Sequence, residues 1–214
     1  MKRSKSCEKA KMMKTQFAVM ILFSLVSLAI TLILGIPAIP IIFMHAALFF
    51  IAAYFIWEKN WKTTKQKLGL DGKLKEKILY GLVGFVVLLI IGMLMSLIAQ
   101  QFGTTDASKI SGKLQDLPLY VIIFSFVFAP ISEELFFRGF LTARFGILAS
   151  SIVFAASHLM YGSYFEILGA FVLGISLAIA YKHSKSILTV IIMHALFNVT
   201  SIILMVIQGT LRLV

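Results

Sequence analysis

The sequence has few charged residues, few prolines and a single cysteine. Only 14% of its 214 residues are charged, while 60% are hydrophobic. In soluble domains about 25% of the residues are charged and about 45–50% are hydrophobic. This composition excludes a soluble globular domain. Four prolines and fourteen glycines exclude a collagen or a disordered tail. The lone Cys7 excludes an internal disulfide and is expected to be a reduced cytosolic thiol.

Long apolar runs dominate the chain instead. Each approaches the ~20 residues that a helix needs to cross a bilayer, and an open sheet cannot satisfy its backbone in lipid. We therefore predict an all-α fold, a polytopic integral membrane helical bundle of about seven transmembrane helices that forms one compact membrane domain. The runs are Phe17–Ile36, Ile39–Trp57, Ile78–Ala99, Leu117–Ala143, Phe145–Leu159, Phe165–Tyr181 and Ile187–Ile207.

The net charge of +11 is distributed unequally between the two ends of these runs. The N-terminal side has sixteen Lys and Arg residues, most of them in residues 1–14 and Glu58–Lys77, whereas the opposite side has Lys109, Lys113 and Arg212. Basic loops stay in the cytosol. The pattern predicts a multi-pass protein of the cell membrane with a cytosolic N-terminus, and its basic charge contacts anionic lipid rather than nucleic acid.

Charged residues within the runs are confined to the second half of the chain, and the first three runs contain few polar residues. We therefore divide it into N-terminal membrane helices, residues 1–116, with a polar cytosolic linker at 58–77, and catalytic helices, residues 117–214. The segment Gln100–Asp116 shows no apolar periodicity and is expected to be irregular. His45 has no acidic neighbour in the sequence and is interpreted as structural.

The fourth run contains two adjacent glutamates and an arginine. Charges in lipid cost several kcal/mol unless they are paired. Glu134 and Arg138 are four residues apart, share a helix face and form a favourable pair. Glu133 is rotated about 100° away and has no sequence-local partner, which suits a general base. The alternative is that the run ends before Glu133 and the three charges are solvated.

The later runs contribute His158, and then His194 and Asn198 four residues apart. A rise of roughly 1.5 Å per residue brings these side chains and Glu133 to one layer of the membrane. A glutamate and a histidine can polarise a water molecule, and histidine and asparagine can donate hydrogen bonds to an oxyanion. The set predicts hydrolysis of a peptide bond.

Other intramembrane protease sites do not fit the sequence. It has no His-Glu-x-x-His motif for a zinc site on one helix. Its aspartates, Asp71, Asp106 and Asp116, all lie outside the runs, which excludes an aspartyl pair. A Gly-x-Ser-Gly serine motif is also absent, because Leu177 follows Ser176. Only the glutamate arrangement remains.

These motifs resemble those of the CAAX protease and bacteriocin-processing family (the CPBP or Abi family), which includes the CAAX prenyl endopeptidases. The family motifs are Glu-Glu-x-x-x-Arg, Phe-x-x-x-His and His-x-x-x-Asn or Asp. All three occur in order and on separate runs, and the resemblance covers about Leu117–Ile207. The matching residues are Glu133, Glu134 and Arg138, then Phe154 and His158, then His194 and Asn198.

The resemblance implies an intramembrane endopeptidase and a role for each of these residues. Its catalytic residues would be Glu133 and His158, which activate water, and His194 and Asn198, which form the oxyanion hole. Its supporting residues would be Glu134, Arg138 and Phe154. A share of the base role for Glu134 is the alternative.

The motifs say less about the cofactor and the substrate than about the reaction. No cofactor is required, although Glu133, His158 and His194 could bind zinc; we favour the metal-free mechanism because asparagine is a poor zinc ligand. The expected partners are the lipid bilayer and a peptide or lipidated-protein substrate of the prenylated CAAX, pheromone or bacteriocin type. Two other functions stay open: a non-catalytic immunity or scaffold protein of the same fold, and a transporter with a proton relay, for which no inverted repeat is evident.

Overall fold

The computed structural model describes residues 38–58, 60–101, 108–115 and 119–211. The chain divides into two compact units, Met1–Met44 and His45–Val214. The first apolar run, Phe17–Ile36, and Cys7 lie outside the described residues. Every element in the described part of the chain is a helix, which confirms the predicted all-α fold.

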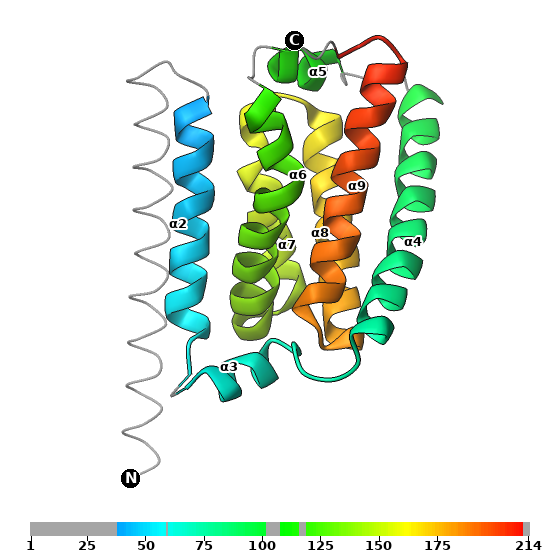
Figure 1. Cartoon of the computed structure of the whole chain (residues 1–214). Coiled ribbons are helices and arrows are strands. Elements are labelled where there is room, and N and C mark those ends of the chain that lie inside the picture. The colour runs from blue at the N-terminus through cyan, green and yellow to red at the C-terminus, as the bar shows by residue number, and fades with distance from the viewer. Residues whose placement is uncertain (1–37, 59, 102–107, 116–118, 212–214) are drawn as a thin grey trace. The chain divides into compact units, whose positions relative to one another are not determined.

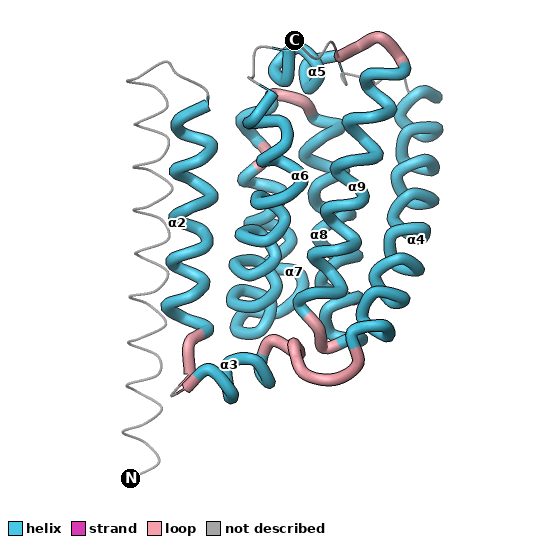
Figure 2. The backbone as a smooth tube through the Cα atoms, in the orientation of Figure 1, coloured by secondary structure: helices cyan, strands magenta, loops and turns pink. Residues whose placement is uncertain are grey.

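The helices of the second unit lie side by side, with short helices at both ends (Figures 1 and 2). Helices α6, α7, α8, α9 and α4 form the bundle, α3 lies at one end and α5 at the other. The elements are α2 (Ala38–Ile56), α3 (Trp61–Lys67), α4 (Leu74–Gln101), α5 (Ser108–Gln115), α6 (Leu119–Glu134), the π-helix η1 (Leu135–Thr142), α7 (Ala143–Ser157), the 3-10 turn η2 (Leu159–Tyr161), α8 (Tyr164–Ser184) and α9 (Ile187–Ile207).

Several of these helices are long and apolar enough to cross a membrane. Within the described residues there are four such stretches, α4, Leu119–Tyr161, α8 and α9, or up to five if α2 and α3, bent by 105°, count as one. The protein is therefore a multi-pass membrane protein, while the number of seven spans stays a prediction. The outer face of α4 carries exposed side chains that suit contact with lipid rather than water, among them Leu79, Val83, Val86 and Ile90.

The stretch Leu119–Tyr161 reverses direction at Gly146. Its 43 residues would extend about 65 Å as one helix, twice the thickness of a bilayer core. Gly146 has φ 87° and ψ 177°, a conformation open to glycine. Hydrogen bonds from Thr142 to Ser150 (2.9 Å) and from Ser150 to the carbonyl of Phe137 (2.8 Å) close the hairpin. Its two arms correspond to the fourth and fifth predicted runs.

The two ends of the bundle are fixed by hydrogen bonds to main-chain carbonyls. At the α3 end, the carbonyl of Leu68 accepts from the amide of Ile187 (2.9 Å), and Thr189 donates to the carbonyl of Lys77 (3.3 Å). At the other end, Lys109 donates to the carbonyl of Gly162 (3.1 Å), and Gln115 to that of Thr210 (2.7 Å). These bonds tie the start of α9 to the end of α3 and to α4, and they tie α5 to the loop between α7 and α8 and to the turn after α9.

The segment Gln100–Asp116 is not irregular throughout, so that prediction was wrong. Helix α4 continues to Gln101, and Ser108–Gln115 forms α5. Ile110 is buried, and the helix is held from both sides by the hydrogen bonds just described. Eight residues are too few for an apolar period to stand out in sequence, because tertiary contacts supply most of the stability of so short a helix.

Gly69 provides a test of the packing at the α3 end. It has φ 61°, and a Cβ atom there would overlap the carbonyl oxygen of Lys185, a main-chain atom that cannot move aside easily. Gly72 has φ 86° but open space around it. Alanine at Gly72 should cost only the left-handed penalty of about 1–2 kcal/mol, whereas Gly69→Ala should lower the melting temperature in detergent clearly further. Equal melting temperatures would mean that this contact does not form.

Candidate active site

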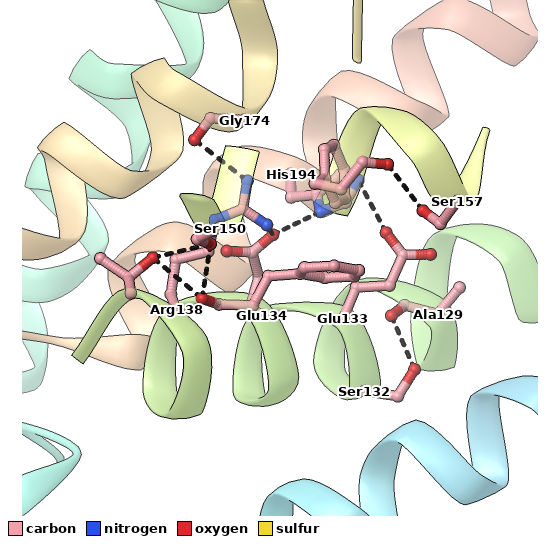
Figure 3. Close-up of polar contacts among 12 residues, drawn as sticks. Ala129, Ser132, Glu133, Glu134, Arg138, Ser150, Ser157, Gly174 and His194 are labelled. Carbon is pink, nitrogen blue, oxygen red and sulfur yellow. Dashed lines mark hydrogen bonds and ion pairs between the residues drawn. The ribbon is translucent and has the colours of Figure 1, made fainter. Parts of the chain in front are cut away.

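The carboxylate of Glu134 is the most deeply held group of the site. Its Oε1 atom accepts hydrogen bonds from Arg138 Nη1 (2.8 Å) and from His194 Nδ1 (2.7 Å). Glu134 and Arg138 are 0% exposed, and His194 is 3% exposed. Figure 3 shows His194 facing both glutamates from the opposing helix. The predicted Glu134–Arg138 pair is thus confirmed, and the alternative of a helix that ends before Glu133 is wrong.

Arg138 connects this pair to two further helices. Its guanidinium lies 4.5 Å from the ring centre of Phe154 on α7, and Nη2 donates to the carbonyl of Gly174 on α8 (3.4 Å). A cation over an aromatic face is stabilised by the ring quadrupole, more strongly where water is excluded. Phe154 is itself 0% exposed. Phe154 therefore links the second motif to the arginine of the first by direct contact.

Glu133, the adjacent carboxylate, has different surroundings. Its Oε1 atom is 3.7 Å from His45 Nδ1, and its Oε2 atom is 3.9 Å from His194 Nε2. The side chain keeps 15% of its surface exposed, in contrast to the fully buried Glu134. Because both distances exceed that of a good hydrogen bond, the carboxylate lies between two imidazoles without being fully engaged by either.

His45 is the site residue that sequence reasoning missed. It was interpreted as structural because no acidic residue is near it in the sequence. In the structure it is 5% exposed, and its Nδ1 atom lies 2.9 Å from Ser132 Oγ as well as near Glu133. The contact joins residues 87 positions apart, and no local pattern could have indicated it. A buried histidine with no partner in its own run was the only available signal.

His158 ends α7 and is linked to the cluster through an aromatic ring. Its Nδ1 atom lies 2.9 Å from the carbonyl of Phe154. Since a carbonyl only accepts, Nδ1 carries the hydrogen, and the lone pair of Nε2 is available. The Phe154 ring lies 4.8 Å from the His158 ring and 5.9 Å from the His194 ring, measured between centroids. The two predicted histidines therefore flank one phenylalanine.

Asn198 lies one turn beyond His194 on α9. Its amide nitrogen donates to the carbonyl of Ser125 on α6 (3.1 Å). The structure thus brings Glu133, Glu134, Arg138 and His194 into one cluster, joins His158 to it through Phe154, and holds Asn198 against α6.

The predicted alternative zinc ligands are Glu133, His158 and His194. Within the described residues, no group of three or more His, Cys, Asp or Glu side chains is placed to hold a metal ion. Nδ1 of His194 is engaged by Glu134, and its Nε2 atom faces Glu133.

The contacts of Glu134 predict that glutamine at Glu134 lowers stability more than glutamine at Glu133. Glu134→Gln leaves Arg138 as a buried charge without its carboxylate, which should cost about 3–5 kcal/mol. Glu133→Gln removes no close hydrogen bond and should melt near the wild-type temperature. Thermal unfolding of both variants in detergent measures the difference. A wild-type melt for Glu134→Gln would indicate that water reaches Arg138.

Comparison with known proteins bears on this half of the chain. Residues 115–200 match the family model described as type II CAAX prenyl endopeptidase Rce1-like. No curated protein and no solved structure matches the chain. The matched segment contains all three motifs and every residue of the cluster except His45. This match is consistent with the CAAX protease (CPBP) family, a family of membrane proteases, as the motifs predict.

Proposed function

We propose that this CAAX-type protease is an intramembrane endopeptidase in which Glu133 activates the attacking water. One observation carries the proposal: of two adjacent buried glutamates, one is fully engaged by Arg138 and His194, and the other is not. The engaged carboxylate supports the structure, and the second retains lone pairs for a proton. This arrangement favours Glu133 over Glu134 as the base.

The first step is proton transfer from water to Glu133. His158 assists, because its Nδ1–H is donated to the Phe154 carbonyl and its Nε2 lone pair can accept a hydrogen bond from the same water. As the O–H bond breaks, the water oxygen forms a bond to the carbonyl carbon of the peptide. Glu133 then returns the proton to the amide nitrogen as the C–N bond breaks, which yields an amine and a carboxylic acid that ionises on release.

The negative charge on the carbonyl oxygen requires donors. His194 Nε2 faces the Glu133 side of the cluster. Because Nδ1–H is donated to Glu134, Nε2 donates only when the ring carries a proton on both nitrogens. With that proton on His194, the charges of the two glutamates, Arg138 and His194 sum to zero, which lowers the cost of burying them together. The second amide hydrogen of Asn198 would complete the oxyanion hole.

The substrate is proposed to be a membrane-associated peptide or a lipidated protein. The site lies within long apolar helices, so a scissile bond must enter the bilayer region, and an apolar or lipidated segment would hold it there. A prenylated CAAX protein, a pheromone and a bacteriocin-type leader all meet this requirement. No observation favours the non-catalytic scaffold or the transporter.

Replacing the proposed base, Glu133, tests its role in catalysis separately from its effect on stability. Glu133→Gln keeps the shape of the side chain but cannot take a proton, so turnover should fall by about 10²–10⁴-fold. Cleavage of candidate lipidated and leader peptides in detergent measures turnover, and unchanged melting excludes unfolding. Glu133→Asp is a further comparison. It keeps a carboxylate at this position and should therefore keep measurable activity. Full activity of Glu133→Gln would rule out Glu133 as the base.

The metal-free mechanism gives an independent expectation. Purified protein should hold less than one zinc per chain in elemental analysis, and cleavage should survive treatment with a chelator. Stoichiometric zinc that is lost in both His158→Ala and His194→Ala would replace this mechanism with that of a metalloprotease.

A further inference from the structure

We propose that His45 is a positioning residue of the site, supplied by a helix outside the segment that matches the family. The inference rests on the proposed function of Glu133. His45 lies on α2, seventy residues before the matched segment begins at residue 115. It nevertheless contacts two consecutive residues of the first motif helix, Ser132 and Glu133.

The hydrogen-bond pattern fixes the direction in which the imidazole acts. Ser132 Oγ lies 2.9 Å from the carbonyl of Ala129, to which it donates its only hydrogen. The serine oxygen must therefore accept from His45 Nδ1–H at 2.9 Å. The same Nδ1 atom lies 3.7 Å from Glu133 Oε1. His45 is thus anchored by Ser132 on the side of the carboxylate that His194 does not face.

The two imidazoles flank the carboxylate from two different helices. Oε1 faces His45 of α2, and Oε2 faces His194 of α9. The His45 ring is kept in its plane by an edge contact with Phe124, at 5.5 Å between centroids. Without His45, Glu133 would be oriented from one side only. A base that is displaced by about 1 Å can lose about 10²-fold in rate.

Two substitutions at His45 and one at Phe49 test this role. His45→Leu removes the donor, whereas His45→Asn keeps an N–H near the position of Nδ1. Phe49→Leu is the matched control, because Phe49 packs against Phe128 of α6 (6.0 Å) one turn further along the same interface. His45→Leu should lower kcat by about 10–100-fold with little change in KM. His45→Asn should retain most of the wild-type kcat, and Phe49→Leu should keep all of it.

The outcomes distinguish this proposal from the function it rests on. If wild type cleaves peptide and Glu133→Gln does not, the proposed function holds. A kcat of His45→Leu equal to that of Phe49→Leu, once corrected for the folded fraction, would then overturn the positioning role alone. Loss of activity in both His45 variants in proportion to lost stability would also overturn it. An inactive wild type would overturn both.

Discussion

The buried carboxylate of Glu134 is the interaction on which the rest of the structure depends. It joins the end of α6 to Arg138 and to His194 of α9, and through Arg138 to Phe154 of α7 and the Gly174 carbonyl of α8. A charge in this setting is costly unless its partners are in place. The four helices that carry these groups must therefore pack together before the buried charges are compensated. The requirement for stability thus also fixes the geometry of the site.

The same helix presents its second carboxylate in another way. One residue earlier, the turn of about 100° directs Glu133 away from Arg138 and into the space between two imidazoles. Adjacent residues of identical chemistry thus differ in their partners: one neutralises a cation, and the other lies 3.7 Å from one imidazole nitrogen and 3.9 Å from the second. The π-helix that follows Glu134 buries the arginine beneath aromatic side chains, and single π-turns are frequent at functional sites.

Local sequence patterns predicted the local features of this fold. The apolar runs indicated the helices, and the spacing of four between Glu134 and Arg138 indicated their pair, because both follow from the period of one helix. Contacts between distant residues could not be predicted in this way. The bond from His194 to Glu134 spans 60 positions and that from His45 to Ser132 spans 87. The π-helix and α5 depend on tertiary packing, which leaves no periodic signature in a short segment.

The central claim is that Glu133 and His194 act on opposite sides of the reacting carbonyl. A structure with a phosphinic analogue of a cleaved peptide tests it most directly, because its two phosphorus-bound oxygens mimic the attacking water and the oxyanion. The account predicts one oxygen within hydrogen-bond distance of Glu133 and the other within reach of His194 Nε2 and Asn198 Nδ2. An analogue that is bound through Glu134, or outside this layer of the bundle, would contradict it.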